Sequence, residues 1–258
     1  MPVVRLETQD AVGHIVLDRP PANSYDRGFM DDLGAAIDAA AADDAVKAIV
    51  VRSASEKFFS AGADVSVFAK SDFDTKNAFV VCANETMSKL EQTPKVVIAA
   101  IAGHCLGGGF EIALCCDFRI AADGGYRIGL PEVSLGLLPG TGGTQRLPRL
   151  IGRQRALELM LRGTTLLPQE AKDAGLIDEL LAPADFAAKV HDRARSYTQG
   201  PSYAVGQIKL ATVQGFGASL AEGLRIEREA LIRLFKSDDA REGVTAFLEK
   251  RKPEYKGR

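Results

Sequence analysis

The chain has 258 residues, of which 46% are hydrophobic and 26% are charged, the balance of an ordinary folded protein. This length suffices for one large domain or two small ones with a sizeable buried core. The formal net charge of −2 gives no electrostatic basis for binding nucleic acid or an anionic membrane surface. No apolar run approaches the roughly 18 residues that a membrane span requires.

The N-terminus and the cysteines predict a cytoplasmic protein. The first residues, Met1-Pro-Val-Val-Arg-Leu-Glu7, lack the basic and then apolar order of a signal peptide. The four cysteines, Cys82, Cys105, Cys115 and Cys116, have no CxxC spacing. In a chain of this length we expect reduced and mostly buried thiols rather than a disulfide framework.

Strands and helices are predicted to alternate over about the first 190 residues. Two short runs on either side of Asp10-Ala-Val-Gly13 predict a hairpin, and Ser24 or Asp26 can cap the helix that follows. The predicted elements are strands Val3–Leu6 and His14–Leu17, a helix with Phe29, Leu33, Ile37 and Ala40 on one face, strand Ala48–Val51, helix Lys76–Gln92, strand Val96–Ile101, helix Gly108–Cys115, and strands Phe118–Ala121 and Tyr126–Ile128. The segment Ser53–Asp64 is predicted to be a loop. This alternation indicates an α/β fold with right-handed crossovers.

From Gly142 onward the chain is predicted to be mainly helical. The predicted elements are helices Arg153–Leu161, Pro168–Ala174, Asp185–Thr198, Tyr203–Val213, Leu220–Phe235 and Asp238–Lys250, with one strand candidate at Ile177–Leu181. Helices with apolar faces must pack against something, so we expect this C-terminal part to contact another subunit.

Two segments share one design, in which a buried strand leads through a loop of small residues to a helix. Strand Ile49–Val51 leads to Ala61-Gly-Ala-Asp64, and strand Val96–Ile101 leads to Gly107-Gly-Gly109. Backbone N–H groups of such loops can turn outward, and two of them aimed at one point form an oxyanion hole. The alternative, of equal weight on the local pattern, is that these glycines serve only tight turns and close packing.

Nucleotide-binding patterns are incomplete. The pattern GxxxxGK[ST] is absent, because Gly140-Thr-Gly-Gly-Thr144 is not followed by a lysine. The residues around His104 do not supply a GxGxxG fingerprint, and no acidic residue ends a suitable following strand. The sequence therefore argues against an NAD site or nucleotide hydrolysis.

Glu111 and Glu132 are the candidate catalytic acids. Glu111 lies three residues past Gly108, and the apolar residues around it predict burial, so this acid needs a partner or a function. The alternatives are a glutamate that stabilises a helix N-terminus for Glu111 and an exposed loop acid for Glu132, which follows Pro131. Two acids in one apolar pocket would shift each other's pKa values, so that one could donate a proton while the other accepts one.

Other candidate groups are better explained by structural roles. His104 and Cys105 are adjacent, so on an extended chain their side chains point to opposite faces and do not form a nucleophilic pair. His14 and His191 are isolated in the sequence, which makes a histidine metal site improbable. Lys250-Arg-Lys252 is typical of a solvated helix end, although it could also meet an anionic cofactor.

The sequence resembles the enoyl-CoA hydratase/isomerase (crotonase) family nearly from end to end. The motifs that carry the resemblance are Phe59-Ser-Ala-Gly-Ala-Asp64, Ile101-Ala-Gly-His-Cys-Leu-Gly-Gly-Gly-Phe-Glu111, Gly129-Leu-Pro-Glu-Val-Ser-Leu-Gly136 and Pro139-Gly-Thr-Gly-Gly-Thr-Gln-Arg-Leu147. The resemblance implies an α/β spiral of ββα units over residues 1–195, which contains the active site. It also implies a helical trimerisation region over residues 196–258 and assembly as a homotrimer or hexamer.

The same resemblance implies an acyl-CoA thioester substrate whose carbonyl oxygen lies between the backbone N–H groups of Ala63 and Gly108. Glu111 is assigned to water activation and Glu132 to protonation of Cα. Residues implied in binding the substrate or its CoA part are Pro21, Ala22, Ala61, Asp64, Val65, Gly107, Pro131, Gly140, Phe247 and Lys250, the last two from a neighbouring subunit. No metal is implied, and no cofactor beyond the CoA of the substrate.

The resulting hypothesis is a trans-2-enoyl-CoA hydratase. The alternatives are a Δ3-Δ2 enoyl-CoA isomerase, another acyl-CoA lyase or hydrolase, and a non-catalytic relative that binds acyl-CoA or RNA, against which the intact acid pair argues. One departure from the family pattern is Asn23-Ser24-Tyr25, where an aliphatic residue commonly stands third, and we expect it to reshape the entrance. The segment Val65–Asn77 has no pattern that indicates an acyl chain length.

Overall fold

The strands form two sheets. The computed structural model describes residues 2–257 and all of their side chains except that of residue 68. The larger sheet has the order β1-β2-β3-β5-β7-β10, and the smaller one has the order β4-β6-β8-β9. The strands are β1 (Val4–Gln9), β2 (Val12–Leu17), β3 (Ala48–Ser53), β4 (Phe58–Ser60), β5 (Val96–Ile101), β6 (His104–Leu106), β7 (Phe118–Ala122), β8 (Ile128–Gly129), β9 (Thr165–Leu166) and β10 (Glu179–Leu181).

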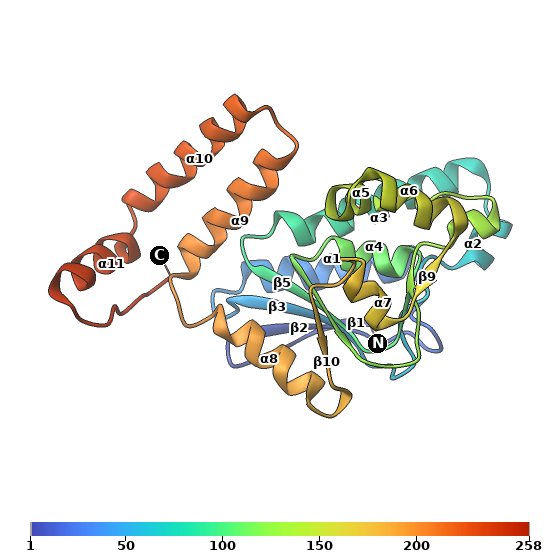
Figure 1. Ribbon diagram of the computed structural model, residues 1–258, viewed down its shortest axis with the longest axis horizontal. Helices are drawn as coiled ribbons and strands as arrows, with labels where there is room; N and C mark the ends of the chain where they lie inside the picture. The colour runs from blue at the N-terminus through green and yellow to red at the C-terminus, as the bar shows by residue number, and fades with distance from the viewer. Residues whose placement is uncertain (1, 258) are drawn as a thin grey trace.

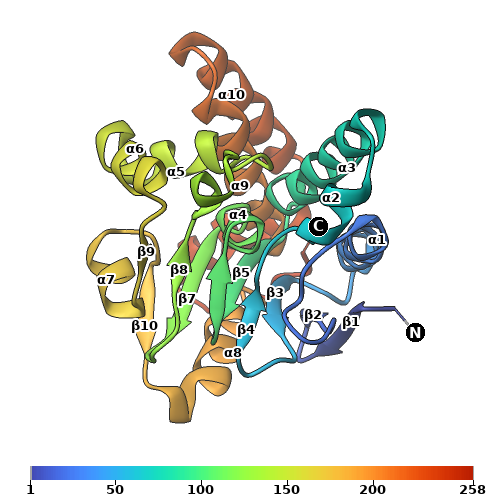
Figure 2. The same ribbon diagram turned by 90° about the vertical axis from the view of Figure 1, so that its right-hand side faces the viewer.

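Helices cover the larger sheet on both faces, with α1, α3 and α4 on one face and α8 on the other (Figures 1 and 2). The helices are α1 (Arg27–Ala42), α2 (Val65–Lys70), α3 (Phe73–Gln92), α4 (Gly108–Leu114), α5 (Gly143–Ile151), α6 (Arg153–Arg162), α7 (Pro168–Asp173), α8 (Phe186–Ser196), α9 (Ser202–Phe216), α10 (Leu220–Phe235) and α11 (Asp238–Glu249), with 3-10 turns η1 (Glu132–Leu135) and η2 (Pro183–Asp185).

The predicted hairpin is confirmed, and it begins a sheet that is otherwise parallel. β1 and β2 pair antiparallel, and the turn residues Asp10 and Ala11 both have positive φ, at 50° and 63°. Such a turn matches the twist of the two strands. The pairs β2–β3, β3–β5, β5–β7 and β7–β10 are all parallel. Asp26 caps α1 by accepting the N–H of Phe29 at 3.0 Å.

The apolar strands are buried on both faces, as their continuous apolar sequence predicts. Ile49 and Val51 of β3 belong to the main core under α1 and α3, whereas Ala48 and Val50 belong to a second cluster under α8. Because neighbouring side chains of a strand point to opposite faces, both sets are apolar only when both faces are covered.

The prediction of a loop over Ser53–Asp64 is wrong at residues 58–60, which form β4 and pair with β6. Strands of two or three residues are too short to show an alternating pattern. The helices α2 and α5 were not predicted either. α5 opens at Gly142-Gly143 and contains Pro148, all of them poor helix formers. It is held by its packing against α4 and α6 rather than by intrinsic propensity.

The last three helices, α9 to α11, form an arm that projects from the body (Figure 1). The predicted helices of this region are confirmed, and the predicted boundary at residues 195 and 196 falls at the end of α8. The arm leaves large apolar side chains exposed, among them Ile208, Phe216, Leu220, Phe235, Val244, Phe247 and Leu248. Within residues 2–257, no helix combines the length and the apolar character that crossing a membrane requires. A trimerisation role for the arm stays a prediction.

Candidate active site

Glu111 lies in the first turn of α4 and is 2% exposed. Its Oε1 accepts the N–H groups of Thr141 at 2.8 Å and Gly143 at 2.7 Å, and its Oε2 accepts the Thr141 hydroxyl. Burial raises the pKa of this carboxyl above its usual range, and the hydrogen bonds from Thr141 and Gly143 oppose that rise. The carboxylate is therefore buried and also supplied with donors.

Glycine geometry allows the backbone to approach Glu111 this closely. Gly142 has φ of +115°, which places the next residues at the start of α5. A Cβ added to Gly143 would lie 2.7 Å from the Cβ of Pro139 and 3.1 Å from Oε1 of Glu111. Any side chain at residue 143 would therefore displace the donor from the carboxylate.

Glu132 opens the turn η1 and has a different environment. Its Oε2 is buried and has no hydrogen-bond partner among the described residues. Burial raises the pKa of Glu132 to about 7, and repulsion from Glu111 adds to the rise. Its Oε1 lies against Gly107, since a Cβ added there would be 2.8 Å from that oxygen. The two carboxyls thus face one site, but Glu111 accepts more hydrogen bonds there than Glu132 does.

The two loops of small residues also meet at this site. β4 and β6 are adjacent parallel strands, so the loops at their carboxyl ends lie side by side. A Cβ added to Gly62, whose φ is +89°, would lie 2.8 Å from the nitrogen of Gly108. Only a residue without a side chain fits this contact.

The backbone pattern leaves one N–H of each loop unused. Tyr25 donates its N–H to Gly62 O and accepts the N–H of Asp64, both at 2.9 Å, so the N–H of Ala63 faces the other side. The N–H of Gly108 belongs to the first residue of α4 and has no partner within the helix. Within residues 2–257, neither N–H has a hydrogen-bond acceptor.

The predicted binding residues of the body lie around these loops. Ala61 donates its N–H to Ala22 O at 2.9 Å, which places the turn at Pro21 beside the first loop. Asp64 caps α2 by accepting the N–H of Ser66 at 3.1 Å. Val65 is exposed, at 53%.

The second loop and η1 hold two more of these residues. Pro131 directly precedes Glu132. Gly140 is exposed, and its carbonyl accepts the side-chain N–H of Asn84 at 3.2 Å.

Phe247 and Lys250 are not brought to this site within one chain. Phe247 is 83% exposed on α11, and Lys250 ends that helix. α11 lies in the arm, at the opposite end of the molecule from α2 and α6 (Figure 1). Their role in binding CoA stays a prediction that needs a neighbouring subunit.

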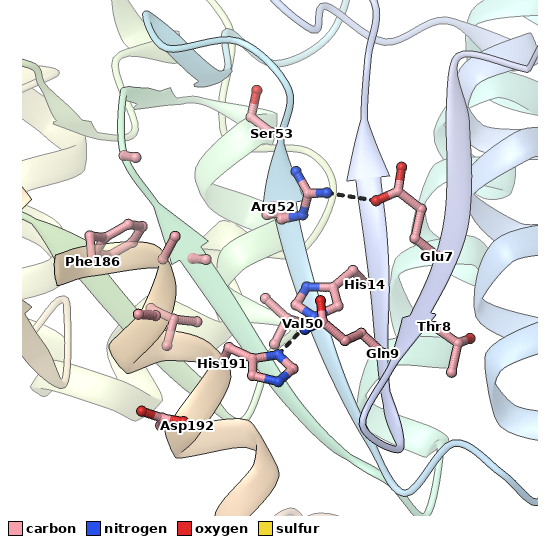
Figure 3. A pocket seen from close by; sticks show the side chains of 15 residues that line it. Glu7, Thr8, Gln9, His14, Val50, Arg52, Ser53, Phe186, His191 and Asp192 are labelled. Atoms are coloured by element: carbon pink, nitrogen blue, oxygen red, sulfur yellow. Dashed lines mark hydrogen bonds and ion pairs between the residues drawn. The ribbon is translucent and has the colours of Figure 1, made fainter. Parts of the chain in front are cut away.

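His14 and His191, which are isolated in the sequence, are neighbours in the structure. The Nε2 of His14 and the Nδ1 of His191 are 3.2 Å apart, and the rings stack with centroids 5.3 Å apart (Figure 3). The pair lines a cavity of about 770 Å³ between the larger sheet and α8, on the opposite face of the sheet from α4. Within residues 2–257, no three His, Cys, Asp or Glu side chains are grouped so that they could hold a metal ion.

Three residues of the site were not predicted from the sequence: Thr141 and Gly143, the partners of Glu111, and Tyr25. The available signal was the glycine cluster at residues 140–143, which also belongs to a motif of the family resemblance and contains the predicted binding residue Gly140.

Comparison with known proteins gives one consistent result. Residues 7–258 match the family model described as enoyl-CoA hydratase/isomerase. The chain is 39% identical over 244 residues to the putative enoyl-CoA hydratase/isomerase YngF of Bacillus subtilis, with 94% of each chain covered. It is 39% identical over 254 residues to a probable enoyl-CoA hydratase of Rhizobium meliloti, covering 98% of this chain and 97% of that one.

Solved structures agree. A crystal structure of an enoyl-CoA hydratase from Geobacillus kaustophilus superposes with a TM-score of 0.97 at 43% identity, covering 100% of this chain and 98% of that one. An enoyl-CoA hydratase from Bacillus anthracis gives a TM-score of 0.93 at 36% identity, covering 99% of this chain and 100% of that one. The expected crotonase-type α/β fold with C-terminal helices is confirmed, and the chain belongs to the enoyl-CoA hydratase/isomerase family.

Proposed function

We propose that this protein is a trans-2-enoyl-CoA hydratase, which adds water across the 2,3 double bond to give a 3-hydroxyacyl-CoA. The observation that carries the proposal is the pair of acids in unequal environments. Glu111 has three hydrogen-bond donors, which favour its ionised form, whereas Glu132 has a buried oxygen without a partner among the described residues. Water addition needs one group of each kind, a base for water and an acid for Cα.

In the proposed reaction the thioester carbonyl accepts hydrogen bonds from the N–H groups of Ala63 and Gly108. Glu111 takes a proton from water as the oxygen forms a bond to Cβ, and the electrons of the double bond move to the thioester oxygen as an enolate. The two N–H groups stabilise this oxyanion, a contribution of roughly 3–4 kcal/mol per donor. Glu132 then gives its proton to Cα, and proton exchange with solvent restores both acids.

The assignment of roles rests on the hydrogen-bond donors around each acid, because burial raises the pKa of both. A carboxyl with a pKa of about 7 is protonated in a large fraction of molecules at neutral pH, as a proton donor must be. The pKa of Glu111 is also raised by burial, but its three donors hold it nearer to the ionised state that a base needs.

The test measures hydration of crotonyl-CoA by the loss of its conjugated absorbance. Glu111→Gln and Glu132→Gln are each expected to lower kcat by about 10²- to 10⁴-fold, because each removes one proton-transfer group. Glu56→Gln, at an exposed position of the loop before β4, is the control and should retain full activity. Near wild-type turnover in either active-site variant would contradict the proposal.

A parallel assay separates hydration from double-bond migration. The same enzyme is given a 3-enoyl-CoA and a 2-enoyl-CoA of equal chain length, and turnover of the 3-enoyl-CoA alone would indicate an isomerase. A panel of 2-enoyl thioesters then measures the preferred chain length.

We further propose that the protein works as a homotrimer or hexamer in the cytoplasm, with no cofactor beyond the CoA of its substrate. The exposed apolar side chains of the arm support the assembly. The four free cysteines, three of them buried, support a reducing compartment.

A further inference from the structure

Tyr25 is buried beside the candidate site instead of lining its entrance. It follows the Pro20–Pro21 turn and directly precedes Asp26, the cap of α1. Its side chain is 1% exposed, and its ring lies 6.1 Å from that of Phe29. The expectation that residues 23–25 reshape the entrance is therefore wrong for this side chain, which points inward.

The phenol of Tyr25 supports the second donor loop. A Cβ added to Gly108 would lie 1.7 Å from the Tyr25 oxygen, so Gly108 packs directly on that oxygen. The backbone of Tyr25 also bonds both neighbours of Ala63, Gly62 and Asp64. One residue thus contacts the segments that carry both candidate oxyanion donors.

The phenol oxygen also reaches the partner of the base. It lies 3.4 Å from the hydroxyl oxygen of Thr141, which in turn bonds Glu111. Because Thr141 donates its only hydroxyl proton to Glu111, Tyr25 must be the donor in its contact with Thr141. The separation is long for a hydrogen bond between two hydroxyls, so the contact is a weak one.

We infer that Tyr25 is a positioning residue. Its hydroxyl packs against Gly108 and donates a hydrogen bond to Thr141, which in turn donates to Glu111. Tyr25 thereby fixes the oxyanion donors and the base relative to each other. This inference rests on the proposed function. The two hydrogen bonds form a hydroxyl chain, which runs from the Tyr25 hydroxyl to the Thr141 hydroxyl and ends on the Glu111 carboxylate. In such a chain each hydrogen bond strengthens the next.

The charged and titratable groups around Glu111 come from three elements. Burial raises the pKa of Glu111, and Arg146 of α5 lowers it. The charge of Glu111 in turn adds to the burial that raises the pKa of Glu132 in η1 and of the Cys115 thiol at the end of α4. Tyr25 itself stays protonated, because burial raises the pKa of its phenol above the usual range. A change in the titration of Glu111 on removing the Tyr25 hydroxyl therefore reports the hydroxyl chain.

The experiment uses Tyr25→Phe, which keeps the ring and removes the proton donor. We expect kcat for crotonyl-CoA to fall by about 3- to 10-fold with KM nearly unchanged. The acidic limb of the profile of kcat/KM against pH should move to higher pH by a few tenths to about one unit, because the ionised Glu111 loses support. A purely structural role would lower thermal stability without moving this limb.

Two further variants make the test specific. Thr141→Val breaks the same chain and should move the limb in the same direction, and adding Tyr25→Phe to it should move the limb no further. Tyr126→Phe is the matched control, since Tyr126 is also buried and donates to the carbonyls of Ile101 and Ala122, outside the site. It should leave the limb in place.

The outcomes separate this inference from the proposed function. A wild-type enzyme that turns over no enoyl-CoA overturns the proposed function. An active wild type with Tyr25→Phe unchanged in kcat and in its acidic limb overturns the role of Tyr25. If Tyr25→Phe does not fold, Thr141→Val decides, because an unmoved limb in that variant also contradicts the hydroxyl chain.

Discussion

The environment of the Glu132 carboxyl suits the proton-donor role proposed for it and destabilises the folded protein when the carboxyl is ionised. Its Oε2 is buried without a partner among the described residues, and its pKa is raised to about 7 by burial and by the charge of Glu111. When the pKa of an acid is higher in the folded state than in the unfolded state, the folded state binds the proton more tightly. The contribution of Glu132 to the stability of the folded state is full below pH 4.5, the pKa of the carboxyl in the unfolded state. It is lost as the pH rises to about 7.

Glu132→Gln should therefore stabilise the protein at alkaline pH while it lowers kcat. The variant does not titrate, so its gain over wild type should be absent below pH 4.5 and complete above about pH 7. Allowing for solvent screening of a partly exposed carboxyl, we expect about 1–2 kcal/mol, or a rise in Tm of about 2–6 °C. Thermal unfolding at pH 4.5 and pH 8 measures it, and an equal difference at both pH values would show that titration of Glu132 is not the cause.

At the scale of elements, an arginine joins the segment between η1 and α5 to helix α3. Arg146 makes a two-pronged ion pair with Glu91 of α3, at 2.8 and 2.7 Å, and donates to Thr141 O at 3.0 Å. The pair is partly buried. α3 therefore fixes the position of the N–H groups that hold Glu111.

Arg146→Lys keeps the charge and loses the two-pronged geometry. We expect a loss of about 1–3 kcal/mol of stability and a fall in kcat of about 10-fold through displacement of Thr141. Arg149→Lys is the control, because Arg149 lies on the same helix and is exposed. Unchanged kcat in the destabilised variant would show that the segment keeps its position without Arg146.

At the scale of the whole molecule, one buried ion pair joins the arm to the body. Lys209 of α9 lies 2.8 Å from Asp117, beside β7, and also donates to the carbonyls of Leu90 and Lys95 at 2.9 Å. This pair and the packing of α9 against α3 and β5 join the arm to the body, while α10 and α11 present exposed apolar side chains. Such a surface on a well-directed arm is typical of a subunit interface.

Phe235→Glu should weaken the assembly, because Phe235 is 72% exposed on α10 and a charge there resists burial. Light scattering on an eluting column is expected to give three or six times 27.6 kDa for the wild type and a smaller mass for the variant. Gln214→Glu adds the same charge at an exposed polar position of α9 and should leave the mass unchanged. A monomeric wild type would refute the predicted assembly.

The parts of the fold that could be predicted were those with a local cause. β3 and β5 are continuous apolar runs because both faces of the sheet are covered, and Asp26 stands where a helix cap is needed. Glu111 could be singled out because its neighbours are apolar. β4 and β6 could not be predicted, because strands of three residues carry no period and are defined by each other.

Contacts between distant segments could not be predicted. Thr141 meets Glu111 across 30 residues, and that contact depends on the positive φ of Gly142. His14 and His191 are 177 residues apart and meet because α8 folds onto the sheet. The direction of the Tyr25 side chain is set by the packing of its ring, which no pattern in residues 20–26 reveals.

The parallel pairing of β4 and β6 bears on how this scaffold can acquire new reactions. The two candidate oxyanion donors are main-chain groups of the loops that follow these strands, and close contacts at Gly62 and Gly108 admit no side chain there. The acids are side chains on other elements and can be exchanged by single mutations. On the proposed function, packing therefore constrains the loops that would bind the thioester carbonyl, whereas either acid can be replaced without disturbing these contacts, and divergence of the reaction should begin at η1.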